Sequence, residues 1–248
     1  MAATAASATP ALVLPPPYSL MTLRESGDAF AEACRIAGEA GAGTLVWVRR
    51  FDLVEFAVVL EPEEPLKAAR RGFYCCMKAL ADAVSAYCPP ERELTVEWPG
   101  TILFNGARIG GGRLGWPEGG GEDEPPDWLV FSAMITAAWV GEGDPGYRIT
   151  ATSLEEEGFE ADGGAVVEAF ARYLMLAFDT LSERGFDPIA ESYLGRLAIR
   201  KAGERRGIDG NGDLLIHSQA QADVERFAFV PAVVEAAWFD PSTGMPRM

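Results

Sequence analysis

A single cation beside a run of glycines is the feature of this chain most able to do chemistry. Arg108 is followed, one residue later, by Gly110-Gly111-Gly112. Glycine backbone can approach a ligand more closely than any residue that carries a side chain, and a guanidinium binds carboxylates and phosphates through charge-assisted hydrogen bonds. The pattern therefore predicts a site for an anionic ligand. A hairpin with a glycine bulge that serves only packing is the alternative.

The residues before Arg108 predict how this cation is positioned. Trp98-Pro99 predicts a rigid, non-helical corner, because proline fixes its own φ and restricts the residue before it. Residues 102–104 are typical of a short buried strand, and Asn105-Gly106 is a strong two-residue hairpin turn. A return strand that begins at Ala107 would then carry Arg108 and the glycines.

A second pair of cations, Arg49 and Arg50, follows a predicted strand at residues 44–48. Two guanidiniums at the end of a strand can hold a phosphate or a carboxylate through paired hydrogen bonds. This pattern predicts a second group of anion-binding residues, and a solvated basic pair is the alternative.

No metal site is expected from the sequence. There is one histidine, His217, and the four cysteines contain no CxxC spacing. Residues 209–213 begin like a calcium-binding loop, but Leu214 stands where that loop needs glycine and Ala220 where it needs glutamate. A hairpin turn is the favoured interpretation of this segment.

Composition restricts the class of protein. The 248 residues, 48% hydrophobic and 23% charged, can bury a full core as one large domain or as one domain with a small appendage. The formal charge of −16 argues against a nucleic-acid partner. The sequence contains no run of about 18 apolar residues, so no segment is expected to span a membrane. The Ala- and Pro-rich start predicts a disordered leader, and the cysteine pattern favours reduced thiols in a cytoplasmic protein.

Hydrophobic periodicity predicts interleaved helices and strands. Because hairpins are frequent, a mixed sheet backed by helices fits better than a purely parallel sheet. Helices are predicted at 24–40, 68–87 and 163–184, and strands at 44–48, 54–60, 128–140 and 147–152; residues 94–97 are expected to lead into the hairpin. The predicted division is a disordered leader at 1–20, a main α/β domain at 21–187 and a small β-rich domain at 188–248.

Two separated segments resemble the biotin/lipoate protein ligase superfamily. Residues 97–114 are similar, without a gap, to its segment Lys-Trp-Pro-Asn-Asp-Ile-x-x-Asn-Gly-Lys-Lys-Ile-Gly-Gly-Ile-Leu. Residues 206–209 with 213–216 resemble a run of the C-terminal SH3-like domain of biotin ligases, and 185–193 resembles the linker into it. Over roughly 24–217, the resemblance implies a class II synthetase-like catalytic domain with a mixed, helix-packed sheet and an SH3-like C-terminal domain.

The resemblance also implies an activity. In that family a carboxylic acid is activated with ATP and Mg²⁺ to an acyl-adenylate and then passed to a lysine of a carrier protein. The family lysine that contacts the acyl carboxylate and the adenylate phosphate matches Arg108, which is therefore the predicted catalytic residue; biotin or a lipoate-like acid is the implied ligand. The predicted substrate-binding residues are Arg49, Arg50, Trp98, Pro99, Gly100, Thr101, Gly110, Gly111 and Gly112.

Three polar elements of the family are altered. Gly100-Thr101 replaces the Asn-Asp pair, and Ser132–Thr136 replaces a Gly-Ile-Gly-Ile-Asn run. The Gly-Arg-Gly-Arg-x-Gly loop after the strand at 44–48 is absent, because the next strand begins almost at once. The sequence therefore predicts an acyl-protein ligase of unusual substrate. A non-catalytic relative that binds an acyl ligand or a carrier protein is the alternative, and a purely structural partner subunit is a third hypothesis.

Overall fold

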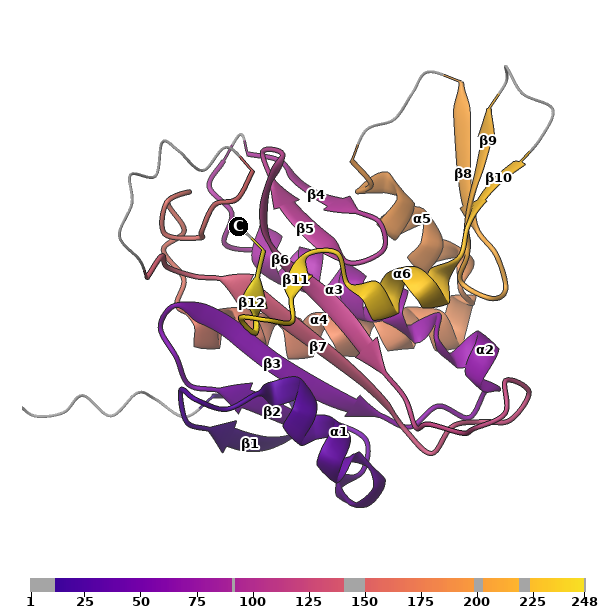
Figure 1. Ribbon diagram of the computed structural model, residues 1–248, viewed down its shortest axis with the longest axis horizontal. Helices are drawn as coiled ribbons and strands as arrows, with labels where there is room; N and C mark the ends of the chain where they lie inside the picture. Colours follow the sequence, from indigo (N-terminus) through magenta and orange to yellow (C-terminus); the bar gives the residue numbers. More distant parts are fainter. Residues whose placement is uncertain (1–11, 91, 141–149, 199–202, 219–223, 248) are drawn as a thin grey trace, which may run out of the picture.

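The computed structural model describes residues 12–90, 92–140, 150–198, 203–218 and 224–247. Its centre is a seven-stranded sheet in the order β1-β2-β3-β7-β6-β5-β4 (Figure 1). β1 is parallel to β2, and every other neighbouring pair is antiparallel. The strands are β1 (Ser19–Leu23), β2 (Thr44–Val48), β3 (Leu53–Leu60), β4 (Leu94–Glu97), β5 (Thr101–Phe104), β6 (Ala107–Gly115) and β7 (Leu129–Thr136).

Helices cover one face of this sheet and enclose the main core. They are α2 (Leu66–Ala69), α3 (Gly72–Ser85), α4 (Gly163–Arg184) and α5 (Asp187–Gly195). The ring of Phe170 on α4 lies 4.5 Å from that of Phe56 and stacks on Phe131 at 5.8 Å, measured between ring centroids. Burying such rings is the main stabilising contribution of this layer.

The opposite face is shared by two covering elements. Helix α1 (Ala29–Ala40) places its alanines at 29, 33 and 37 against the outer side of β2 and β3. The rest of the cover is the C-terminal segment: α6 (Phe229–Glu235), whose Phe229 and Val233 reach the main core, leads to the two-residue strands β11 (Phe239–Asp240) and β12 (Met245–Pro246). β12 lies over β6 and β7 (Figure 1).

A second, smaller sheet projects beyond α5 (Figure 1). It is antiparallel, in the order β10-β9-β8, and consists of β8 (Glu204–Ile208), β9 (Leu214–Ser218) and β10 (Val224–Phe227). Together with the helix-backed mixed sheet, it confirms the predicted α/β fold class with a small β-rich C-terminal region. Within the described ranges, every helix is too short or too polar to cross a membrane.

Several predicted elements coincide with the structure and others differ from it. The strand at 44–48 and the helix at 163–184 have the predicted bounds, and residues 94–97, expected only to lead into the hairpin, form β4. Asp28 caps α1, which shortens the helix predicted from 24, and the helix predicted at 68–87 is divided into α2 and α3. The strand predicted at 128–140 ends at 136, and residues 147–149 of another lie outside the described residues.

The predicted disordered leader at 1–20 is described only from residue 12. There Leu12, Leu14 and Tyr18 pack against the main core, and β1 begins at residue 19. For residues 12–20 the structure therefore differs from the prediction, because the Pro-rich stretch leads directly into an edge strand of the sheet.

The corner at Trp98-Pro99, whose peptide bond is cis, is tied to the helical layer by a buried hydrogen bond. The hydroxyl of Tyr193 donates to the Pro99 carbonyl oxygen at 2.6 Å. Tyr193→Phe would leave this carbonyl buried without its donor, so we expect the free energy of unfolding to fall by about 1–3 kcal/mol. Urea denaturation measures the change. Tyr173→Phe is the matched control, since no hydrogen bond of its hydroxyl is found among the described residues, and an equal effect of both variants would contradict the prediction.

Candidate functional site

The three consecutive glycines of β6, Gly110 to Gly112, each lie where a side chain would not fit. A Cβ at Gly110, whose φ is +145°, would overlap the carbonyl oxygen of Met134. A Cβ at Gly112 would point into the helical layer, 2.6 Å from the Met77 sulfur, whereas one at Gly111 would point to the other face. Packing within the protein thus accounts for this run in the present conformation, and ligand binding by it stays a prediction.

Gly111 faces the C-terminal segment. A Cβ at Gly111 would lie 2.6 Å from the indole of Trp238 and would also overlap the Gly100 carbonyl oxygen. The same Gly100 oxygen accepts a hydrogen bond from the Gly112 N–H at 2.8 Å. The predicted corner and the predicted glycine run are therefore in direct backbone contact.

Arg108 is the second residue of β6 and lies beneath the C-terminal residues. Its backbone pairs with the segment beside it, through Arg108 N to Thr150 O and Thr152 N to Arg108 O, both at 2.9 Å. Its guanidinium donates to the Arg247 carbonyl oxygen at a long 3.4 Å. Its Nε is buried and has no hydrogen-bond partner among the residues described.

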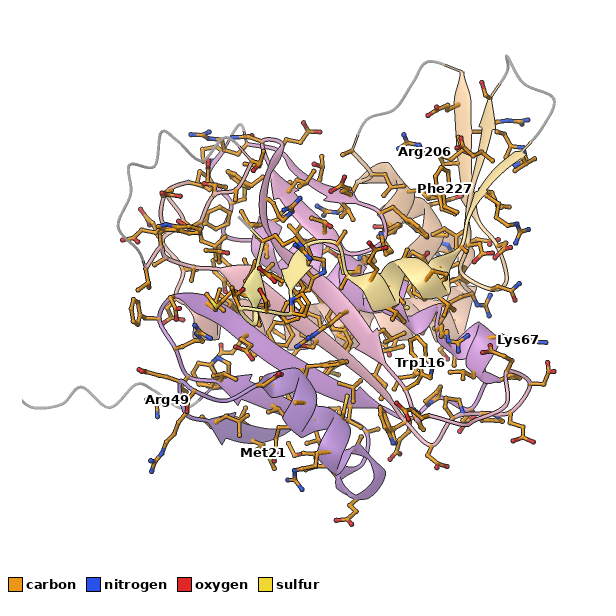
Figure 2. All side chains as sticks on the ribbon, in the orientation of Figure 1. Met21, Arg49, Lys67, Trp116, Arg206 and Phe227 are labelled. Carbon is orange, nitrogen blue, oxygen red and sulfur yellow. The ribbon has the colours of Figure 1, made fainter. Side chains whose placement is uncertain are left out.

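The two predicted cations after β2 differ in their surroundings. Arg50 is held by Asp52 through two hydrogen bonds of 2.7 and 2.6 Å, and it also contacts Glu55 at 3.4 Å and the sulfur of Met245 at 3.6 Å. Arg49 is exposed, and Figure 2 shows it at the margin of the molecule. Of Arg49 and Arg50, only Arg50 therefore contacts the C-terminal segment, as Arg108 does.

The remaining predicted site residues belong to the Trp98-Pro99 corner and to the start of β5. The indole N–H of Trp98 donates to the Tyr74 hydroxyl at 3.2 Å, and its ring meets Phe227 of the small sheet at 6.2 Å between centroids. Thr101 is buried in β5. Trp98 thus joins the helical layer to the small sheet, whereas the backbone at Gly100 is the part of the corner that contacts the glycine run.

Arg113, which directly follows the glycine run, is a further cation of this face. Its side chain is 13% exposed, lies between the rings of Phe30 at 4.1 Å and Phe239 at 4.5 Å, and donates to Asp28 at 3.4 Å. Desolvation lowers the pKa of Arg113. The signal that could have found it is strand alternation, because a residue two positions after Gly111 points to the same face.

A buried carboxylate lies under the same cover. Glu55 accepts a hydrogen bond from the Ala29 N–H at 2.9 Å, and burial raises the pKa of Glu55, with Asp28 acting in the same direction. Arg50 and Arg113 act against this rise. The face therefore combines three guanidiniums with buried or half-buried carboxylates, which partly neutralise them.

A separate cavity of about 1260 Å³ opens at the ends of β2 and β3. Arg24, Arg49 and Arg50 line it together with the start of α4, but Arg108 and the glycine run do not. The cavity therefore does not unite Arg49 and Arg50 with Arg108 in this conformation. The C-terminal segment lies over β6.

The sequence model of the biotin/lipoate A/B protein ligase family matches residues 14–195, and the chain belongs to this family. It is similar to the biotin–[acetyl-CoA-carboxylase] ligase of Paracoccus denitrificans, with 26% identity over 218 residues that cover 80% of this chain and 88% of that protein.

Solved structures show the same architecture. A biotin protein ligase-like protein from a Silicibacter species superimposes with a TM-score of 0.75 and 25% identity, covering 90% of this chain and 99% of that one. The biotin protein ligase of Aquifex aeolicus in complex with biotin and ATP superimposes with a TM-score of 0.61 and 14% identity, covering 84% and 94%. The second likeness concerns the fold alone.

The packing of the glycine run can be tested at Gly110. Gly110→Ala would place a Cβ against the Met134 carbonyl at a φ that L-residues rarely adopt, so we expect a loss of about 3 kcal/mol or more in the free energy of unfolding. Gly210→Ala, in a turn where no other atom lies within 4 Å of the added Cβ, is the control and should change stability by less than about 1 kcal/mol. Thermal and urea unfolding would compare them, and a tolerated Gly110→Ala would show that β6 and β7 are not this close.

The pH dependence of stability tests the environment of Glu55. Because the pKa of Glu55 is raised in the folded chain, the folded state keeps a proton that the unfolded state releases. The contribution of Glu55 to stability is therefore highest below the ordinary glutamate pKa of about 4.3 and falls as the pH rises through the raised folded value. Glu55→Gln cannot ionise, so we expect it to escape this fall.

Urea unfolding at a series of pH values from about 4 to about 8 measures this difference. The stability of Glu55→Gln relative to the wild type should increase with pH over this window. Glu39→Gln, at an exposed position of α1, is the control and should give a difference that does not vary. A pH-independent difference for Glu55→Gln as well would contradict the raised pKa.

Proposed function

We propose that this chain is a divergent protein ligase of the biotin/lipoate type, which activates a carboxylic acid with ATP and transfers the acyl group to a lysine of a carrier protein. The observation that carries the proposal is the position of Arg108. It stands where the family has its substrate-binding lysine, it lies on a sheet face beside bare glycine backbone, and its buried Nε has no protein partner among the described residues.

The chemistry asked of these residues is electrostatic. In the first step a carboxylate oxygen attacks the α-phosphorus of ATP and pyrophosphate leaves; in the second the lysine amine attacks the acyl carbonyl and AMP leaves. Arg108 would hold the carboxylate and the α-phosphate together and stabilise the negative charge that develops between them. Arg113, on the same face, would supply a second positive charge. No nucleophilic side chain of this chain is needed.

Magnesium would arrive with the nucleotide. In the part of the chain that the structure describes, no group of three or more His, Cys, Asp or Glu side chains could hold a metal ion. Mg²⁺ is commonly bound through substrate phosphates with only one or two carboxylates from the protein. ATP as a substrate is thus compatible with this donor set, with the ion bound mainly by the phosphates.

One observation favours the alternative, a non-catalytic relative that binds an acyl ligand or a carrier protein. The connection from β2 to β3 has only the four residues 49–52, and Arg50 within it is held by Asp52 and Glu55. Such a connection has little length with which to close over an adenylate. Excluding water is how enzymes protect reactive intermediates, so a short connection favours binding without turnover.

A carrier protein would have to approach a largely acidic chain. Four arginines could gather into one basic patch, namely Arg49, Arg50, Arg70 and Arg71. Of these, Arg50 is paired with Asp52, and Arg70 is paired with Glu122 at 2.7 Å and lies over Trp116 at 4.5 Å. A carrier surface with basic residues near its lysine is therefore the better electrostatic match to the net charge of −16. No nucleic-acid partner and a cytoplasmic location remain part of the proposal.

Release of pyrophosphate from ATP tests the proposal. With biotin, lipoate and octanoate offered in turn, we expect one acid to support release, and Arg108→Ala to lower kcat/KM by at least about 100-fold through the loss of transition-state stabilisation. Arg108→Lys should keep part of the activity. Arg172→Ala, at an exposed position of α4 on the opposite side of the sheet, is the control.

Each outcome separates the two candidate functions. Turnover that depends on Arg108 supports the ligase. Tight binding of an acid or of ATP without any pyrophosphate release supports the non-catalytic binder. Turnover that is unchanged in Arg108→Ala would show that the reacting groups lie elsewhere on the molecule.

A further inference from the structure

Residues 236–247, here called the C-terminal strap, lie on the sheet face that carries Arg108. The strap residue Trp238 is 2% exposed and packs with Leu53, Met134 and Ala236. Its indole N–H donates to the Gly112 carbonyl oxygen at 3.1 Å. The flat ring therefore occupies the space directly above the bare backbone of Gly111.

The strap also contacts all three guanidiniums discussed for this face. The ring of Phe239 covers Arg113 at 4.5 Å, the carbonyl oxygen of Arg247 accepts the long bond from Arg108, and the sulfur of Met245 lies 3.6 Å from Arg50. A ligand that used these cations and the glycine backbone would have to occupy the position of the strap. The described conformation is therefore a covered one.

Among the described residues, the strap is held to the sheet by side chains and not by a strand ladder. β11 pairs with β12, and both lie inside the strap. The other backbone hydrogen bonds of the strap, among the described residues, stay within it or reach back to α6. The preceding helix is fixed differently, because Phe229 and Val233 of α6 are buried in the main core. The strap thus begins where a firmly anchored helix ends.

The backbone has an unusual conformation at that point. Ala236 has φ +43° and ψ +66°, in the left-handed region that residues other than glycine rarely adopt. Rotation at such a residue moves everything after it and leaves α6 in place. Hinges of this kind lie at the ends of secondary-structure elements.

We infer that the C-terminal strap is a displaceable cover that turns at Ala236 and exposes a binding site for an anionic ligand, in which Arg113 is a second contact beside Arg108. Trp238 indicates the chemistry of the rest of the ligand. The space above Gly111 accepts a flat ring with an N–H donor for the Gly112 carbonyl, and the cations accept a carboxylate or phosphate attached to it. The identity of the ligand rests on the proposed function; the movement of the strap does not.

Cysteine labelling tests the movement without any ligand. Met134 is 3% exposed and lies beneath Trp238, whereas its neighbour Ala133 points to the opposite face and is buried in the main core. In Met134→Cys and Ala133→Cys, the rate at which iodoacetamide modifies each introduced thiol would be followed by peptide mass spectrometry, which separates it from the four native cysteines. We expect the thiol at position 134 to react at least about 10-fold faster under native conditions, because only the strap covers it.

A binding experiment tests what the strap covers. A site that is open only part of the time binds with an affinity reduced by the open fraction. We therefore expect the double variant Trp238→Ala/Phe239→Ala to bind biotinyl-adenylate, or ATP with biotin, at least about 10-fold more tightly than the wild type in calorimetric titration. Val234→Ala, on α6 at a side chain 65% exposed, is the control and should not change affinity.

The outcomes separate this inference from the proposed function. Equal labelling at positions 133 and 134 shows a fixed strap and overturns the inference, even if the wild type binds the adenylate. Faster labelling at 134 with unchanged or weaker binding in the double variant also overturns it, because the strap then does not compete with the ligand. If neither chain binds any of these probes, the proposed function fails, and the labelling rates alone decide whether the strap moves.

Discussion

The backbones of Gly100 and of the glycine run in β6 lie so close together that no side chain fits between them, and the arrangement of the candidate site depends on this contact. The Gly112 N–H donates to Gly100 O at 2.8 Å, and a Cβ at Gly111 would overlap the same oxygen. The contact joins the Trp98-Pro99 corner to β6. It thereby fixes which face of β6 carries Gly111 and Arg113, and it leaves a flat strip of backbone on which a planar group can lie.

In the described conformation that planar group is Trp238. The indole is bound to Gly112, the neighbouring aromatic ring covers Arg113, and the last described residues reach Arg108. A chain of the biotin/lipoate A/B protein ligase family therefore carries, on its candidate ligand face, an occupant from its own C-terminus. The long bond from Arg108 and the unpartnered Nε among the described residues show that the strap satisfies this guanidinium only in part. A ligand with an anionic group would satisfy it better.

Local sequence signals predicted the framework because each had a local physical cause. The Asn105-Gly106 turn has positive φ at both residues, as a two-residue hairpin requires, and Asp28 caps α1 through a hydrogen bond to the Ala31 N–H. The glycine run was recognised as a place of close approach, but the sequence could not say whether a ligand or the protein approaches. Nothing local to residues 236–247 shows that they pack more than 100 positions away on β6. Likewise, the shielding of Arg113 depends on rings from two distant elements.

A crystal structure of the chain grown with ATP and biotin would test the central claim most directly, since it shows the ligand and the strap together. The account predicts a phosphate or carboxylate within hydrogen-bonding distance of Arg108, a ligand group above Gly111, and Trp238 displaced from Gly112. A ligand bound elsewhere, with the Trp238 indole still donating to the Gly112 carbonyl, would contradict it.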